Sequence, residues 1–232
     1  NNVKRLIHVS SPSIYFEFKD KFNISENEAL PKHFVNYYAK TKKMAEDIIF
    51  NAHLKKGLDT IVIRPRAIFG VGDTALLPRL IRSNCEKFIP IISKKDIQID
   101  ITHVDNVVEA LILAMKAPNS CSGQKYNITN DSPIYMYEFL GNLMKKLKIP
   151  FKTKKIPYFF IMGIAFLLEF ISKYFNRYKE PVFTRYTIGL LAYSQTLDIS
   201  KAKKELGYNP IKTIEEGIKE LVEFNEKTHK YC

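Results

Sequence analysis

Tyr38 and Lys42 stand four residues apart in a stretch, 36–56, whose apolar residues keep helical spacing. Residues four apart on a helix share a face, so this phenol and this ammonium can act on one small volume. A free phenol ionises only at about pH 10, and a neighbouring cation favours its ionised form. The pair therefore suits proton transfer at the oxygen of a carbonyl or an alcohol. Taken alone, the spacing also fits an exposed helix face, so the surrounding segments decide.

Those segments predict alternating strands and helices. Apolar runs at 3–10 and 60–64 predict buried strands, and the helix between them ends at Gly57. Strand, helix and strand in this order predict a parallel pair in a layered α/β fold. Residues 12–34 predict a long, irregular connection. We also expect strands at 97–101 and 125–128, helices at 76–86, 136–147 and 213–227, a short helix within 198–207, and a helix with Asp105 as its N-cap.

The composition narrows the class of protein. The chain has 232 residues, of which 46% are hydrophobic and 26% charged, enough to build a core. Its net charge of +12 comes mostly from lysines spread along helix surfaces without interleaved aromatic residues, so we expect no nucleic-acid partner. Three widely spaced cysteines without a CxxC pair fit a reducing, cytoplasmic compartment. They predict no disulfide framework and no zinc site, and we expect no bound metal.

One segment combines basic and apolar residues. Six lysines fall between Lys145 and Lys155, and residues 156–168 follow without a charge. An uncharged run of this length is too short to span a bilayer, which needs about 20 residues. It fits a buried or substrate-lining helix, and it also fits a helix lying on a membrane with lysines at the headgroups. We expect no membrane span and keep open a peripheral membrane contact through 145–171.

Four motifs in order resemble the extended short-chain dehydrogenase/reductase family, in its NAD-dependent epimerase/dehydratase and 3β-hydroxysteroid dehydrogenase-like branch. They are VSSPSIY at 9–15, the Tyr38/Lys42 pair, IRPRAIFG at 63–70 and THVD at 102–105. The segments at 184–198 and 197–210 also resemble this branch, in which the chain is similar to 2-alkyl-3-oxoalkanoate reductases.

The resemblance implies the C-terminal portion of a Rossmann-type doubly wound parallel sheet with a smaller, mostly helical substrate lobe. Residues 1–130 would form a partial Rossmann core that carries the catalytic residues, with excursions into the lobe near 72–96. Residues 131–232 would supply most of the lobe and the C-terminal helices. The resemblance also implies a homodimer.

The same resemblance assigns catalytic roles. Ser11 would hydrogen-bond the substrate oxygen, Tyr38 would exchange a proton with it, and Lys42 would assist Tyr38 and hold the nicotinamide ribose. From the residues alone, the serines after the first strand also fit a plain turn. His103, a lone histidine at a strand end, is expected to be structural.

Binding roles follow from the resemblance as well. Pro65 and Ile68 match the loop that places the nicotinamide, so together with Tyr38 and Lys42 they would bind NAD or NADP. Ser13 and Phe69 would contact the substrate.

The glycine-rich fingerprint that holds a dinucleotide pyrophosphate is missing from this sequence. Gly70-Val71-Gly72 follows the wrong strand and lacks a third glycine. The resemblance places the strand at 3–9 at about the fifth position of the fold, so about a hundred residues of the dinucleotide-binding half would precede it. We therefore expect a fragment that binds cofactor poorly and is inactive alone.

Three functions remain open. The first is an oxidoreductase acting on a keto or hydroxy group of a small apolar substrate, of the β-keto acyl or 3β-hydroxysteroid kind. The second is a sugar-nucleotide epimerase or dehydratase, although Pro12 and Ser13 occupy the positions where dehydratases carry acidic residues. The third is a truncated, non-enzymatic paralogue.

Overall fold

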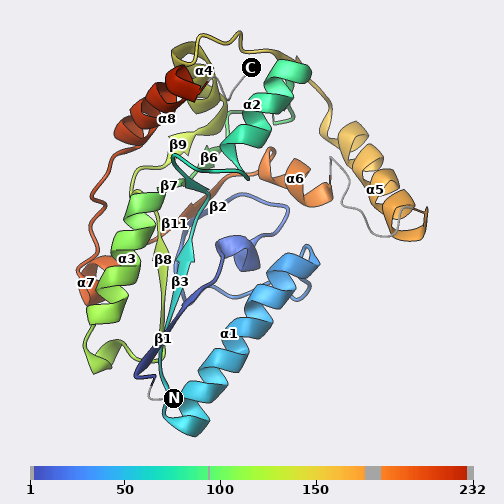
Figure 1. Ribbon diagram of the computed structural model, residues 1–232. Helices are drawn as coiled ribbons and strands as arrows, with labels where there is room; N and C mark the ends of the chain where they lie inside the picture. Colours follow the sequence, from blue (N-terminus) through green and yellow to red (C-terminus); the bar gives the residue numbers. More distant parts are fainter. Residues whose placement is uncertain (1–2, 94, 176–183, 229–232) are drawn as a thin grey trace.

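The computed structural model describes residues 3–93, 95–175 and 184–228 (Figure 1). Strands and helices alternate along most of this length. The strands are β1 (Arg5–Val9), β2 (Lys21–Ile24), β3 (Asp59–Pro65), β4 (Ile68–Phe69), β5 (Ile89–Ile91), β6 (Gln98–Ile99), β7 (Thr102–His103), β8 (Gln124–Ile128), β9 (Ile134–Tyr135), β10 (Thr153–Lys155) and β11 (Gln195–Leu197). The helices are α1 (Tyr37–Lys56), α2 (Leu77–Glu86), α3 (Val104–Lys116), α4 (Met136–Lys146), α5 (Tyr158–Phe175), α6 (Arg185–Leu190), α7 (Ser200–Leu206) and α8 (Ile214–Thr228), with 3₁₀ turns η1 (Pro12–Tyr15) and η2 (Asn119–Cys121).

A parallel sheet of order β1-β3-β8 lies at the centre of the fold. Helix α1 connects β1 to β3 and lies on one face of this sheet, while α3 lies on the other (Figure 1). Central strand β3 is covered on both faces, and every residue from Thr60 to Pro65 is buried. Parallel strands need such cover because their crossover helices pack on the sheet. The predicted α/β class with a parallel sheet is therefore confirmed.

Helix α1 follows the boundaries that its sequence predicts. The side chain of Asn36 accepts a hydrogen bond from the backbone N–H of Ala39, which satisfies one of the free donors of the first turn. Gly57 ends the helix in the left-handed conformation, with φ of 63°, and its N–H bonds the carbonyl of His53. These local signals fix where the helix that carries Tyr38 begins and ends.

Two local expectations are wrong. The N-cap of α3 is His103, whose Nδ1 accepts from the backbone N–H of Asp105, so Asp105 lies inside the first turn. The connection at 12–34 is also more ordered than expected, because it contains η1 and β2, and β2 pairs in parallel with the distant β11.

The cysteines differ from expectation as well. Cys85 is disulfide-bonded, which the spacing of the cysteines did not predict, while Cys121 is a buried free thiol.

A second group of elements covers the carboxyl end of the central sheet. Strands β2, β11, β6 and β9 form a four-stranded sheet in that order, and β6 pairs antiparallel with β9. Helices α2, α4 and α8 share a core whose fully buried members include Ile81, Leu143 and Leu221.

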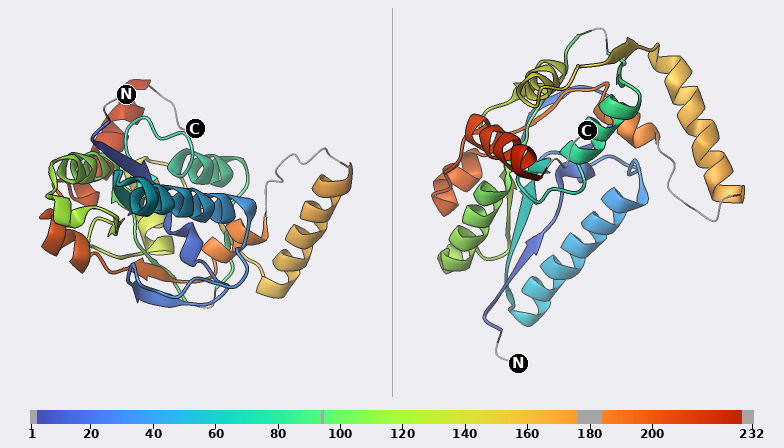
Figure 2. Two further views of the ribbon diagram at one scale, coloured as in Figure 1. Left: turned by 90° about the horizontal axis from the view of Figure 1, so that it is seen from below. Right: turned by 45° about the horizontal axis from the view of Figure 1, so that its top comes forward.

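Helix α5 stands apart from this body in both views of Figure 2. Among the described residues, no helix is both long enough and apolar enough to cross a bilayer.

Candidate active site

Tyr38 and Lys42 lie on one face of α1, near its N-terminal end. The ammonium of Lys42 sits 5.8 Å from the centroid of the Tyr38 ring, and it donates a 3.0 Å hydrogen bond to the carbonyl oxygen of Val9. Tyr38 is 51% exposed, so its ring remains open to a ligand. The adjacent Tyr37 is 80% exposed and has no lysine one turn further along the helix. The structure therefore joins the predicted Tyr–Lys pair to the end of strand β1.

Ser11 and Ser13 lie just past that strand end. Ser11 is the N-cap of η1, and its Oγ accepts a 3.2 Å hydrogen bond from the backbone N–H of Ser13. Because Lys42 bonds the carbonyl of Val9, the lysine lies beside the turn that carries Ser11. Ser13 is buried, and its Oγ has no hydrogen-bond partner among the described residues. A buried hydroxyl without a partner is costly, so it marks a place where a ligand atom would be stabilising.

A buried ion pair fixes α1 to the sheet. Glu46 follows Lys42 by one more turn on the same face of the helix, and one carboxylate oxygen accepts a 2.8 Å bond from Nε of Arg64, while the other accepts from Nη2. Arg64 also donates to the hydroxyl of Tyr15 in η1, and that hydroxyl bonds Asn127 of β8 at 3.2 Å. Burial raises the pKa of Tyr15 to about 12 despite the nearby guanidinium, so this phenol stays neutral. The network locks α1, η1 and β3 in one arrangement.

A second buried cation, Arg66, lies beside Tyr186 of α6. Arg66 is 8% exposed, and it interacts with the hydroxyl of Tyr186 in α6 and with the carboxylate of Asp100. Burial lowers the pKa of Arg66 and raises that of Asp100 to about 6, and Asp100 also accepts from the N–H of Leu197 at 2.7 Å. Burial also raises the pKa of Tyr186. The sequence analysis did not predict this cluster of Arg66, Asp100 and Tyr186.

The residues of the 65–69 loop have different surroundings. Pro65 is buried at the end of β3, opposite Ile128 of β8, whereas Ile68 is 39% exposed. The ring of Phe69 is 1% exposed and packs edge-on against His103 at 5.2 Å, inside the core of α2, α4 and α8. The structure thus gives Phe69 a packing role, and a substrate contact would require this core to open.

The ring nitrogens of His103 lie near two carboxylates that could suggest a metal site. His103, Asp105 and Glu220 bring ligand-type atoms within 4.8 Å of one another. However, the ammonium of Lys212 lies 2.8 Å from Asp105 and also bonds Glu220, so a side-chain cation already occupies the position between the carboxylates. His103 is buried, and burial lowers its pKa, which fits the structural role predicted for it.

An apolar pocket of about 920 Å³ opens between β5, the start of α5 and the segment after α6. Its lining includes Ile92, Tyr137, Tyr158, Phe159 and Tyr193. Tyr193 contacts Phe18 edge-on at 6.5 Å, Phe18 contacts Phe16 at 5.4 Å, and Phe16 contacts Tyr186 at 5.2 Å. A continuous row of aromatic rings therefore runs from the pocket to Tyr186.

Curated relatives match almost the whole chain. A 3beta-hydroxysteroid-dehydrogenase/decarboxylase (isoform 1) of Arabidopsis thaliana is 38% identical over 95% of this chain and 53% of its own length. A 2-alkyl-3-oxoalkanoate reductase of Shewanella oneidensis is 30% identical over 94% of this chain and 59% of its own length. The chain thus spans between half and three fifths of these two relatives.

Solved structures agree on the fold. The NAD complex of a UDP-glucuronic acid 4-epimerase from Bacillus cereus superposes with a TM-score of 0.70 at 18% identity, covering 98% of this chain and 63% of that protein. At this identity the likeness carries the Rossmann-type fold alone. The family model of the 3-beta hydroxysteroid dehydrogenase/isomerase family matches residues 1–158. Because this match covers more than half of the chain, it shows that the chain belongs to the 3-beta hydroxysteroid dehydrogenase/isomerase family.

Proposed function

We propose that this chain carries the proton-transfer and substrate-binding part of an NAD(P)-dependent oxidoreductase that interconverts a keto and a hydroxy group. The observation that carries the proposal is the position of Lys42, whose ammonium bridges the Tyr38 ring and the carbonyl of Val9, two residues before Ser11. This arrangement gathers a proton donor, a cation and a hydroxyl at the carboxyl end of a parallel strand. Ligands of open α/β sheets bind at that edge.

Each residue has a distinct task at the reacting oxygen. The hydroxyl of Ser11 donates a hydrogen bond that holds the oxygen, and Tyr38 gives that oxygen a proton or takes one in the reverse direction. Lys42 keeps positive charge beside the phenol, which stabilises the phenolate form that appears during proton transfer. The buried ion pair of Glu46 and Arg64 keeps the helix, and with it the phenol, in place. A bound nicotinamide would supply or accept the hydride.

The residues present fit the nicotinamide half of such a cofactor. Lys42 offers further N–H donors to ribose hydroxyls, and Pro65 and the exposed Ile68 lie at the end of the neighbouring strand and in the loop after it. The unpartnered hydroxyl of Ser13 offers a further polar contact. For the pyrophosphate, the chain has no glycine-rich turn at a strand–helix junction. We therefore propose that this chain alone binds NAD or NADP weakly.

The proposed substrate is apolar. The pocket at the base of α5 is lined mainly by aromatic and aliphatic side chains, and a row of aromatic rings connects it to Tyr186. Lys95, Asp96 and Lys155 also line this pocket, and their charges would suit a polar group at one end of an otherwise apolar substrate. The names of the curated relatives, a hydroxysteroid dehydrogenase and an oxoalkanoate reductase, point to the same class of substrate. We propose a β-keto acyl chain or a 3β-hydroxysteroid as the substrate.

The test compares this chain with the complete open reading frame that encodes it. Calorimetry with NADH and NADPH should show weak binding to the chain and tight binding to a longer product that carries a glycine-rich turn. That product should oxidise the reduced cofactor with a β-keto acyl substrate, or reduce the oxidised cofactor with a 3β-hydroxysteroid, and should leave UDP-glucose unchanged. Turnover of UDP-glucose alone would favour an epimerase. A reading frame without the glycine-rich turn and without turnover would favour a non-enzymatic paralogue.

A further inference from the structure

Helix α5 exposes an apolar surface of unusual size for a helix outside the core. Phe159 is 88% exposed and Phe160 is 65% exposed. We call the exposed residues together the α5 surface. It comprises Phe159, Phe160, Ile164, Phe166, Leu167, Phe170, Ile171 and Tyr174.

The opposite side of the helix accounts for its attachment to the protein. Ile161 and Ala165 are buried against Ile92 and Ile188, and this small core holds α5 to α6 and to the residue after β5. Because apolar residues also cover the rest of the circumference, the helix is apolar nearly all round. Such a helix normally has lipid or protein on every side. The exposed fractions show that the protein itself covers only one side.

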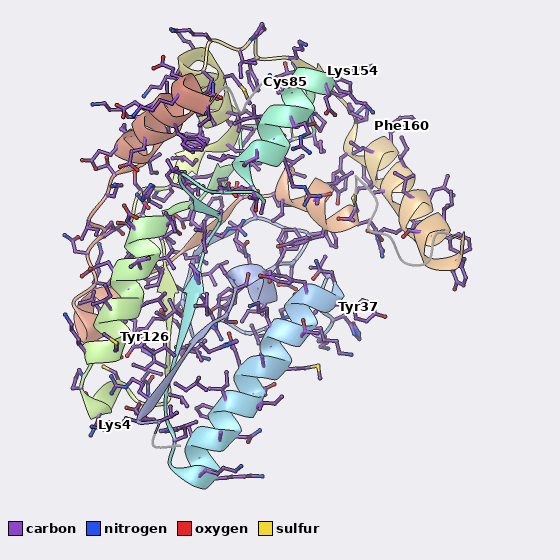
Figure 3. The ribbon with its side chains drawn as sticks, in the orientation of Figure 1. Lys4, Tyr37, Cys85, Tyr126, Lys154 and Phe160 are labelled. Atoms are coloured by element: carbon purple, nitrogen blue, oxygen red, sulfur yellow. The ribbon has the colours of Figure 1, made fainter. Side chains whose placement is uncertain are left out.

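Charge around α5 is arranged for an anionic partner. No Asp or Glu occurs between Phe139 and Leu168, while six lysines fall between Lys145 and Lys155. Lys154 and Lys155 in β10 are exposed and lie just before the helix, and Figure 3 shows Lys154 and Phe160 at the same end of the molecule. The carboxylate of Glu169 on α5 is paired with Arg185 at 2.7 Å. The apolar surface is therefore bordered by positive charge.

We propose that α5 lies in the surface of an anionic membrane, with the α5 surface among the acyl chains and the β10 lysines at the headgroups. An interfacial helix needs this pairing of aromatic residues with basic ones, and it need not span the bilayer. Tyr158 and Phe159 also line the apolar pocket, so the docked helix holds the mouth of this pocket at the lipid surface. A second copy of the chain is a poorer occupant, since it presents the same positive border and offers no complementary negative charge.

The test measures binding of the chain to lipid vesicles by flotation. Vesicles of phosphatidylcholine with about 30% phosphatidylglycerol should bind the chain, and pure phosphatidylcholine should bind it at least tenfold more weakly, because each lysine near an anionic surface contributes about fivefold. Raising the salt to about 1 M should weaken binding to the anionic vesicles, since the Debye length falls to about 3 Å. The double variant Lys154→Glu/Lys155→Glu should weaken it at least tenfold at low salt.

A matched pair of variants tests the apolar part. Phe160→Ser/Leu167→Ser removes two residues of the α5 surface and should lower vesicle binding at least tenfold. Met44→Ser/Ile48→Ser removes two exposed apolar residues of α1, which are 52% and 69% exposed, and should leave binding unchanged. Circular dichroism should show both variants folded, since all four side chains are exposed.

Three outcomes would overturn the proposal. The intact chain could fail to bind anionic vesicles, or Met44→Ser/Ile48→Ser could lose as much binding as Phe160→Ser/Leu167→Ser. Light scattering could instead show a dimer that only Phe160→Ser/Leu167→Ser dissociates, in which case a second copy covers α5. None of these measurements needs a cofactor or turnover, so their result is independent of the proposed oxidoreductase function.

Discussion

The carboxylate of Glu46 and the guanidinium of Arg64 form a two-point ion pair between helix α1 and strand β3, with both side chains buried. Glu46 is on the same face of α1 as Tyr38 and Lys42, so the pair sets the rotation of the helix about its axis. The hydroxyl of Tyr15 takes a further bond from Arg64 and ties in the turn that begins at Ser11. The relative placement of the candidate catalytic residues thus depends on one buried cation.

Breaking this ion pair from one side should destabilise the fold. Glu46→Gln leaves the buried guanidinium of Arg64 without a counter-charge, and we expect a loss of ~3–5 kcal/mol in the free energy of unfolding. Urea denaturation measures it. The control is Asp47→Asn, which removes the exposed Lys43–Asp47 pair and should cost less than ~0.5 kcal/mol. Equal effects of the two substitutions would mean that the Glu46–Arg64 pair does not anchor α1.

Asp100 should make stability depend on pH. Its folded pKa of about 6 lies above the ordinary value of 3.8, so its contribution is fully present below pH 3.8 and is lost as the pH rises through 6. Between pH 5 and 7.5 this loss amounts to ~1.4 kcal/mol. Asp100→Asn removes the titration while keeping an acceptor for the N–H of Leu197.

The measurement for Asp100 is urea denaturation of both proteins at pH 5 and 7.5. The wild-type protein should lose ~1.4 kcal/mol more than the variant on going to pH 7.5. His8 and His103, whose pKa values are lowered by burial, favour the opposite direction, but they occur in both proteins and cancel in the difference. Parallel changes in the two proteins would contradict the role of Asp100.

Two glycines on helices should respond in opposite directions to alanine. A Cβ at Gly217 would come within 2.5 Å of His103 and 2.8 Å of Phe69, so Gly217→Ala must displace a packed core and should cost ~1–3 kcal/mol. A Cβ at Gly163 in α5 meets nothing within 4 Å, so Gly163→Ala should stabilise by ~0.5–1 kcal/mol through helix propensity. Thermal melting of both variants gives the comparison. A neutral Gly217→Ala would show that α8 can move away from Phe69.

Tyr38→Phe should abolish most activity in any NAD(P)-active polypeptide that contains this chain. The substitution removes the proton donor without disturbing the core, because the ring is half exposed, and kcat should fall ~100-fold or more. Tyr37→Phe, at the neighbouring exposed phenol, should keep wild-type turnover. Steady-state kinetics of the two variants decides the assignment, which would fail if both retained activity.

Local chemistry was enough to predict much of the fold. The side chain of Asn36 and the left-handed Gly57 bound α1, and the uninterrupted apolar run in β3 predicts a strand covered on both faces. Such signals act over one or two turns, so a single sequence shows them. The spacing of Tyr38 and Lys42 is equally local, and in the structure the Lys42 ammonium lies beside the Tyr38 ring.

Contacts between distant residues were settled only by the tertiary structure. Arg66 meets Tyr186 across 120 positions of sequence, and Phe69 enters a core formed with α4 and α8. The N-cap of α3 was predicted wrongly for the same reason. Asp105 has the better local propensity for that position, but His103 caps the helix and packs on Phe69. The sequence by itself therefore determined the elements, the family resemblance and the Tyr–Lys pair. Only folding decided which buried partners hold them, because no short-range pattern specifies a neighbour that lies a hundred residues away.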